Sequence, residues 1–186
     1  GKTTLISLLC AHLSYDGRRV AVFFTSIETA REYLERLQRY NIRTALLVGR
    51  SPKTHQTHGE RLAELIATQG HHGFGESRTG ADLFAQTCPL PAFAVNETEA
   101  WQEWLPSDAP CEDIYVSGKE TPHLCPLWSR CGRVKNQREL VHANVWLGHI
   151  RSADTTVPAH TTNERWQYFE LIAKTFDLVI FDEVDE

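Results

Sequence analysis

The chain opens with Gly1-Lys-Thr-Thr-Leu-Ile-Ser-Leu-Leu-Cys10, and this stretch with the residues after it decides the fold. Asp16-Gly17 predicts a turn, and the unbroken apolar run Val20-Ala-Val-Phe-Phe24 is typical of a strand buried in a parallel sheet. Ahead of the turn, leucines at helical spacing predict a helix that begins directly after Gly1. These leucines are Leu5, Leu8, Leu9 and Leu13.

The next residues repeat the pattern. Thr25 or Ser26 is placed to cap a second helix, which has Leu34 and Leu37 on one face. Ala45-Leu-Leu-Val48 then predicts another short buried strand, ended by glycine. This alternation of strand and helix predicts an α/β fold with a parallel, doubly wound sheet over residues 1–50.

Residues 141–186 return to the same pattern. Ala143-Asn-Val-Trp-Leu147 suggests a strand, and a helix is expected from about Asn163 to Thr175. Phe176-Asp-Leu-Val-Ile-Phe181 predicts a strongly apolar strand that runs directly into Asp182-Glu183. We therefore expect residues 1–50 and 141–186 to form one domain.

Residues 51–140 interrupt the alternation and are expected to form an insertion. The stretch is rich in Gly, Pro, His, Thr and Trp, and helices are plausible only at 61–67 and 97–105. Its charge is polarised, because residues 79–118 contain no Lys or Arg and residues 121–138 contain no Asp or Glu. Four of the five cysteines of the chain also lie here.

Composition limits the class of protein. A net charge of −5 argues against a wholly basic nucleic-acid binder but leaves room for a local basic patch. No apolar run approaches the roughly 20 residues of a membrane span. Five cysteines in 186 residues are too few for a disulfide scaffold. Their clustering favours a metal or redox site in a reducing, cytoplasmic setting without a membrane partner.

Gly1-Lys2-Thr3-Thr4 before a helix matches the last part of the phosphate-binding sequence G-x-x-x-x-G-K-[ST]. Backbone N–H groups at the helix start would cradle phosphate, the lysine would add charge near the β/γ oxygens, and a hydroxyl would bind Mg²⁺. A threonine-rich helix start is the plain alternative. Four residues by themselves are weak support for either interpretation.

The other end of the chain strengthens the first interpretation. An ATP site needs one carboxylate at the end of a buried strand for Mg²⁺ and a second acid for the attacking water. Asp182 and Glu183 supply both after an apolar strand, although strands that simply leave the core into an acidic loop are common. Together the two ends predict an ATPase site. In it Lys2 faces the phosphates, Thr3 and Asp182 position Mg²⁺, and Glu183 orients water.

These motifs resemble those of the superfamily 2 helicases, which have a RecA-like P-loop NTPase fold. Gly1-Lys-Thr-Thr4 is similar to their motif I, and Asp182-Glu-Val-Asp185 is similar to their DEAD-like motif II with Val in place of Ala. Thr25 and Ser26 follow their strand where motif Ia touches the DNA backbone in that group. Short hydroxyl residues suit a phosphate contact, but a plain helix cap explains them equally well.

Cys88, Cys111, Cys125 and Cys131 have the spacing C-x22-C-x13-C-x5-C, which matches no common zinc ribbon or knuckle. Four thiolates suit either Zn²⁺ or a [4Fe–4S] cluster. Their place between motifs I and II resembles the XPD/DinG-type iron–sulfur helicases, which implies a [4Fe–4S] cluster here. Zinc, or ordinary buried thiols, are the alternatives, and Cys10 is expected to be a small buried apolar residue.

Two further features bear on the resemblance. Leu140 to His149 is similar to the strand that re-enters the motor core in those helicases, but Gly148-His149 replaces their Asn-His, which leaves the role of His149 open. A basic stretch would line a path for single-stranded DNA with Trp128 available for stacking, or else form a solvated loop. Its candidate DNA contacts are Arg130, Arg133 and Lys135.

The resemblance implies an ATP-dependent DNA helicase or translocase motor, moving 5′→3′ on single-stranded DNA or a forked duplex. It also implies that the chain is a segment of a longer, prokaryotic protein whose second RecA-like domain completes the ATP site. The segment alone would then have little activity. A non-motor P-loop switch, or a nucleic-acid-binding scaffold with a structural zinc, is the alternative.

Overall fold

The structure is a computed structural model that describes residues 1–49, 123–129, 131, 134–158, 162 and 164–182. The chain divides into two units, one of residues 1–49 with 136–186 and one of residues 50–135. The helices expected at 61–67 and 97–105 lie outside the described residues. The first unit contains all the strands described below.

The helices and strands of the described residues follow the order that the sequence predicts at both ends of the chain. In chain order they are α1 (Lys2–Tyr15), β1 (Val20–Phe24), α2 (Ile27–Arg39), β2 (Thr44–Leu47), α5 (Lys135–His142), β3 (Val145–His149), the 3₁₀ helix η6 (Ile150–Asp154), α6 (Tyr168–Thr175) and β4 (Leu178–Asp182).

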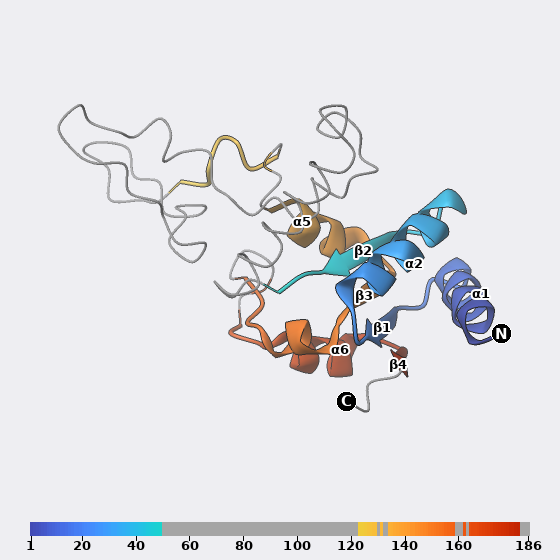
Figure 1. Ribbon diagram of the computed structural model, residues 1–186. Helices are drawn as coiled ribbons and strands as arrows, with labels where there is room; N and C mark the ends of the chain where they lie inside the picture. The colour runs from blue at the N-terminus through green and yellow to red at the C-terminus, as the bar shows by residue number, and fades with distance from the viewer. Residues whose placement is uncertain (50–122, 130, 132–133, 159–161, 163, 183–186) are drawn as a thin grey trace, which may run out of the picture. The chain divides into compact units, whose positions relative to one another are not determined.

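The strands form one four-stranded sheet in the order β2-β3-β1-β4, and every pair is parallel (Figure 1). The prediction of an α/β fold with a parallel sheet is confirmed. The central strand β1 is buried along its whole length, whereas β4, at one end of the described sheet, is half-exposed. Burial on both faces explains why β1 is apolar without interruption.

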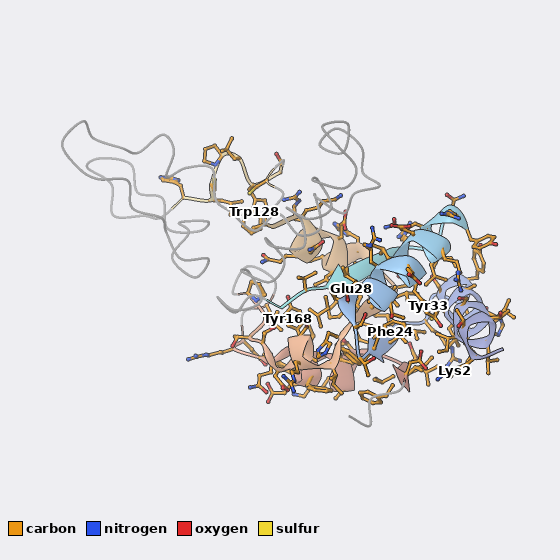
Figure 2. All side chains as sticks on the ribbon, in the orientation of Figure 1. Lys2, Phe24, Glu28, Tyr33, Trp128 and Tyr168 are labelled. Atoms are coloured by element: carbon orange, nitrogen blue, oxygen red, sulfur yellow. The ribbon has the colours of Figure 1, made fainter. Side chains whose placement is uncertain are left out.

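Successive residues of β1 point to opposite faces of the sheet, and helices cover both faces. On one face, Phe23 packs in a core cluster with Leu140 of α5 and Ile172 of α6. On the other, Phe24 meets Tyr33 of α2, with 4.7 Å between ring centroids (Figure 2). The sheet is therefore doubly wound, as the sequence predicts.

Helix α6 begins at Tyr168, five residues later than the sequence predicts. The residues ahead of it pair with an earlier segment instead: the Val157 N–H donates to the Trp166 carbonyl, and the Tyr168 N–H donates to the Thr155 carbonyl. Glu170 accepts from the Gln167 N–H and fixes the start of the helix. The predicted bounds of β2, β3 and β4 differ from the observed ones by one or two residues.

Helix α1 buries Ile6 and Cys10 against the rest of the unit, whereas Leu5 and Leu8 are mostly exposed in the described structure. The prediction that Cys10 is a buried apolar residue is confirmed, since no part of it is exposed. Burial raises the pKa of the Cys10 thiol to about 11. The thiol therefore stays protonated and unreactive near neutral pH.

Arg19 joins β1 to β4 at the amino-terminal edge of the sheet. Its backbone N–H donates to Asp177 Oδ2 at 2.8 Å, and its carbonyl accepts from the Asp177 N–H at 2.9 Å. Its guanidinium lies 4.1 Å from the ring centroid of Phe176 and 5.2 Å from that of Trp146. Burial lowers the pKa of Arg19, and the Asp177 carboxylate partly opposes that shift. A half-buried cation stacked on two aromatic rings stabilises the packing at this edge of the sheet.

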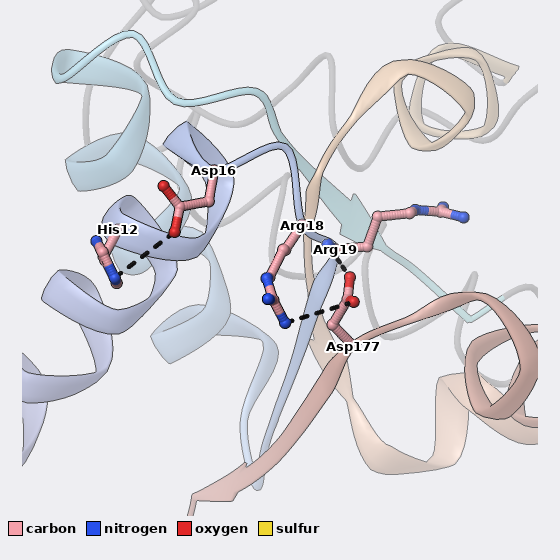
Figure 3. A network of polar contacts seen from close by, with 5 residues as sticks. All are labelled: His12, Asp16, Arg18, Arg19 and Asp177. Carbon is pink, nitrogen blue, oxygen red and sulfur yellow. Dashed lines mark hydrogen bonds and ion pairs between the residues drawn. The ribbon is translucent and has the colours of Figure 1, made fainter.

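Two neighbouring ion pairs, both drawn in Figure 3, have more exposed side chains. Arg18 Nη1 lies 4.0 Å from Asp177 Oδ1, and His12 Nε2 lies 3.7 Å from Asp16 Oδ2 across one turn of α1. Exposed pairs of this length stabilise a fold by about 0–1 kcal/mol. Asp177 therefore contributes mainly through its bond to the Arg19 backbone.

None of the helices in the described part of the chain is both long enough and apolar enough to span a bilayer.

We expect Arg19→Lys to lower the free energy of unfolding by about 1 kcal/mol, because a lysine ammonium loses the planar stacking and the bond to Thr175 Oγ1. Arg18→Lys is the matched control and should change it by less than about 0.5 kcal/mol, since the ion pair of its side chain with Asp177 is exposed. Urea denaturation monitored by circular dichroism measures both. Equal effects of the two substitutions would contradict the stacking argument.

Candidate nucleotide-binding site

The candidate site lies at the carboxyl-terminal edge of the sheet. Because the strands are parallel, their last residues come to the same edge, and Phe24 of β1 pairs with His149 of β3 on one side and Asp182 of β4 on the other. Ligands of open α/β sheets bind outside this edge. Residues far apart in the sequence are thus brought within a few strand spacings of about 4.8 Å.

Helix α1 precedes β1 through a short turn, so its first residue returns to this same edge. There Lys2 Nζ lies 3.0 Å from Asp182 Oδ1, which joins the two ends of the described chain (Figure 2). The turn depends on Gly17, whose φ of 74° is in the left-handed region that glycine adopts easily. The sequence predicts that Lys2 and Asp182 lie close together, and the structure places them in contact.

The two partners differ in exposure. The Lys2 side chain is 53% exposed, whereas that of Asp182 is 13% exposed. An ion pair with one long, solvated partner contributes about 0–1 kcal/mol to stability, so fold stability does not require this lysine. A half-exposed ammonium beside a mostly buried carboxylate places a positive charge suited to a phosphate next to an oxygen ligand suited to a hard cation such as Mg²⁺.

The start of α1 contributes backbone donors. Gly1 is the N-cap, no side chain among the described residues caps the helix, and its first turn contains no acidic residue. The first N–H groups of a helix have no intrahelical acceptor, and the helix dipole favours an anion near them. Thr3 and Thr4 are exposed at this position. Glu183, the predicted water-orienting acid, directly follows Asp182 but lies outside the described residues.

Thr25 and Ser26 leave β1 at the same edge. Ser26 is the N-cap of α2, and its Oγ accepts from the Thr29 N–H at 3.2 Å, so the helix-cap interpretation is confirmed. The Ser26 hydroxyl also donates to Glu28 Oε2 at 2.9 Å. A phosphate oxygen would have to replace that carboxylate to use the Ser26 hydroxyl. Thr25 is exposed, and its role as a DNA contact stays a prediction.

The sequence leaves the role of His149 open. Its Nδ1 accepts from the Arg151 N–H at 3.1 Å, which caps η6. Burial, and then nearby Arg151, lower the pKa of His149 below its usual value. A hydrogen bond with the Thr25 backbone and the Glu28 carboxylate act in the opposite direction. The signal in the sequence was a histidine directly after a buried strand.

The structure explains why position 148 is glycine, where the resembled helicases have asparagine. A Cβ atom at this position would lie 2.8 Å from the Leu47 carbonyl oxygen of the paired strand β2. Such a separation is shorter than a van der Waals contact and involves backbone, which cannot move aside cheaply. Glycine is therefore needed for the close approach of β2 to β3.

The cysteine cluster and the basic stretch are only partly described. Cys88, Cys111, Arg130 and Arg133 lie outside the described residues, and Lys135 is the first residue of α5. The Trp128 N–H donates to the Cys125 carbonyl and the Cys131 N–H to the Leu127 carbonyl, so Cys125 and Cys131 flank a compact turn. Within the described ranges, no three His, Cys, Asp or Glu side chains gather as a metal site would need.

Comparisons of the chain with protein-family models, with curated proteins and with solved structures find no match.

Proposed function

We propose that the chain is the ATP-binding, RecA-like part of a DNA helicase or translocase motor. The observation that supports this most directly is the 3.0 Å approach of Lys2 Nζ to Asp182 Oδ1. These residues lie 180 positions apart, and each belongs to a motif that an ATPase site requires. A helix start without an acidic cap lies beside the same pair.

Each residue has a distinct part in the proposed reaction. Lys2 moves from Asp182 to the β/γ-phosphate oxygens and stabilises the charge that develops there. The N–H groups at the start of α1 donate to phosphate, and Glu183 orients the attacking water. Thr3 and Asp182 would hold Mg²⁺, and their hydroxyl and carboxylate oxygens are the donors that this ion prefers. When bound, Mg²⁺ neutralises charge on the phosphates.

The loop after β1 supports a nucleic-acid partner. Thr25 is exposed at the edge where the nucleotide would bind, and backbone N–H groups and short hydroxyls are common phosphate donors. We propose that this loop contacts the backbone of single-stranded DNA, with Arg130, Arg133 and Lys135 as further contacts. The 5′→3′ direction and a second RecA-like domain that supplies an arginine finger rest on the helicase resemblance alone.

We further propose that Cys88, Cys111, Cys125 and Cys131 hold a [4Fe–4S] cluster. The two described members, Cys125 and Cys131, are half-buried, and the backbone of each makes a hydrogen bond to a residue between them, which suits paired ligands in a loop-built site. In the alternative, a P-loop switch with a structural zinc, the same thiols would bind Zn²⁺. DNA would then not stimulate ATP turnover.

In the full chain, Lys2→Ala and Glu183→Gln should each lower DNA-stimulated ATP turnover by at least about 100-fold, because each removes a group that acts on the transition state. Lys174→Ala is the matched control, since Lys174 lies in the last turn of α6 and its ammonium stacks 3.7 Å from the Trp166 ring centroid. Phosphate release measures turnover. Undiminished turnover in either site variant would remove the proposed ATP site.

Anaerobically purified protein should be brown and contain about four irons per chain, as Cys₄ ligation of the cluster requires. Cys131→Ala should abolish the colour, whereas Cys10→Ala should keep it, because Cys10 is buried on α1 among apolar residues. Absorbance near 400 nm and elemental analysis measure the cluster. A colourless protein with one zinc would contradict the cluster and favour the structural-zinc alternative.

A further inference from the structure

The ion pair between Lys2 and Asp182 joins a carboxylate that is fixed in place to a long, half-exposed cation. Asp182 is the last residue of β4, and its pairing with Phe24 of the central strand β1 sets its backbone position. Its side chain is 13% exposed, whereas that of Lys2 is 53% exposed. A lysine ammonium is carried on a flexible four-carbon stem. Lys2 can therefore leave the pair with little change in the fold, while the carboxylate stays where it is.

The Lys2 ammonium lies close to the position that a metal ion at Asp182 would need. The distance of 3.0 Å between Lys2 Nζ and Asp182 Oδ1 is that of a hydrogen bond. Mg²⁺ binds carboxylate oxygens at about 2.0–2.1 Å. On either oxygen of this carboxylate it would lie within a few ångströms of the ammonium, and water screens charges poorly beside a mostly buried group. The ammonium and a divalent cation therefore compete for Asp182.

A phosphate ligand at this edge would change the balance. Helix α1 begins at Lys2, its first turn contains no acidic residue, and a helix start favours an anion. A phosphate bound there would attract the ammonium of Lys2 away from Asp182. Mg²⁺ in nucleotide sites is usually held by one or two carboxylates together with the phosphates. A nucleotide would thus remove the competing cation and supply further oxygen ligands in the same step.

We propose that Lys2 occupies the cation position at Asp182 while the nucleotide site is empty, so that the site binds Mg²⁺ only weakly until a nucleotide phosphate draws Lys2 away. The inference deepens the proposed function and rests on it for the identity of the ligand. Linked binding equilibria are reciprocal, so the nucleotide raises the affinity for Mg²⁺ by the same factor by which Mg²⁺ raises the affinity for the nucleotide. Lys2 sets a large part of that factor.

Three substitutions separate this role from that of an ordinary surface ion pair. Lys2→Gln removes the charge and keeps a polar side chain, whereas Lys2→Arg keeps the charge. Arg18→Gln is the matched control, because it removes a cation that pairs with Asp177 at the opposite edge of the sheet, at 4.0 Å. The Lys2 and Arg18 side chains are both more than half exposed, so all three variants should fold as the wild type does. Circular dichroism checks this.

Binding of Mn²⁺ alone, as a substitute for Mg²⁺, is measured by electron paramagnetic resonance in the full chain without nucleotide. We expect Lys2→Gln to bind Mn²⁺ about tenfold more tightly than the wild type, because the competing charge is gone. Lys2→Arg and Arg18→Gln should bind it as weakly as the wild type. Lys2→Gln combined with Asp182→Asn should lose the gain, because the carboxylate is the metal ligand.

The reciprocal effect is measured with a fluorescent, non-hydrolysable ATP analogue by anisotropy, first with a chelator and then with Mg²⁺. The wild type should bind the analogue at least about tenfold more tightly with Mg²⁺. This gain should fall about tenfold in Lys2→Gln, because no cation then has to leave Asp182. It should keep its wild-type size in Arg18→Gln.

The outcomes distinguish this inference from the proposed function. If the wild type binds the analogue but Lys2→Gln binds Mn²⁺ no more tightly than the wild type, the inference is overturned and the nucleotide site stands. Equally tight Mn²⁺ binding by Lys2→Arg and Lys2→Gln would also overturn it, because charge would then not be the cause. If Lys2→Gln tightens Mn²⁺ binding but the wild type does not bind the analogue, the competition at Asp182 is supported and the nucleotide-site proposal fails.

Discussion

Strand β1 pairs in parallel with both β3 and β4, and the candidate site depends on this double pairing. It aligns Phe24, His149 and Asp182 at one edge, although more than 120 residues separate the first from the other two. The pairing is maintained by burial, since every residue of β1 is within the core. Because α1 runs back along the sheet, Lys2 reaches the same edge and meets Asp182. A register shift of one residue would move the Asp182 side chain to the other face and separate the pair.

Asp177, directly before β4, and Asp182, the last residue of β4, have different roles at the two edges of the sheet. At the amino edge, Asp177 binds the Arg19 backbone, and Arg19 stacks on Phe176 and Trp146 in a half-buried clamp. At the carboxyl edge, Asp182 forms an ion pair with the half-exposed side chain of Lys2. The first arrangement stabilises the strand pairing. The second contributes little to stability and brings a carboxylate and an ammonium together at the edge where ligands of such sheets bind, as expected of a binding site on a rigid scaffold.

The sequence is sufficient to predict those features that depend on local pattern. Unbroken apolar runs gave β1 and β4 within two residues, and the GKTT and Asp182 motifs at the two ends predicted the pair that the structure brings together. Features that depend on long-range contacts were not predictable. Gly148 is required by the Leu47 carbonyl of another strand, and α6 starts late because its preceding residues pair with Thr155 and Val157. That His149 caps η6 depends on the position of the Arg151 N–H, which only the folded chain defines.

The most direct test of the central claim is binding of Mn²⁺, a substitute for Mg²⁺ at oxygen ligands, in the presence of a non-hydrolysable ATP analogue. Electron paramagnetic resonance distinguishes bound from free Mn²⁺. Asp182→Asn should weaken nucleotide-dependent Mn²⁺ binding by at least about tenfold. Asp177→Asn, directly before the first residue of the same strand, should leave it unchanged, because its carboxylate lies at the amino edge. Equal Mn²⁺ affinity in Asp182→Asn and wild type would contradict the assignment of a nucleotide site to this edge.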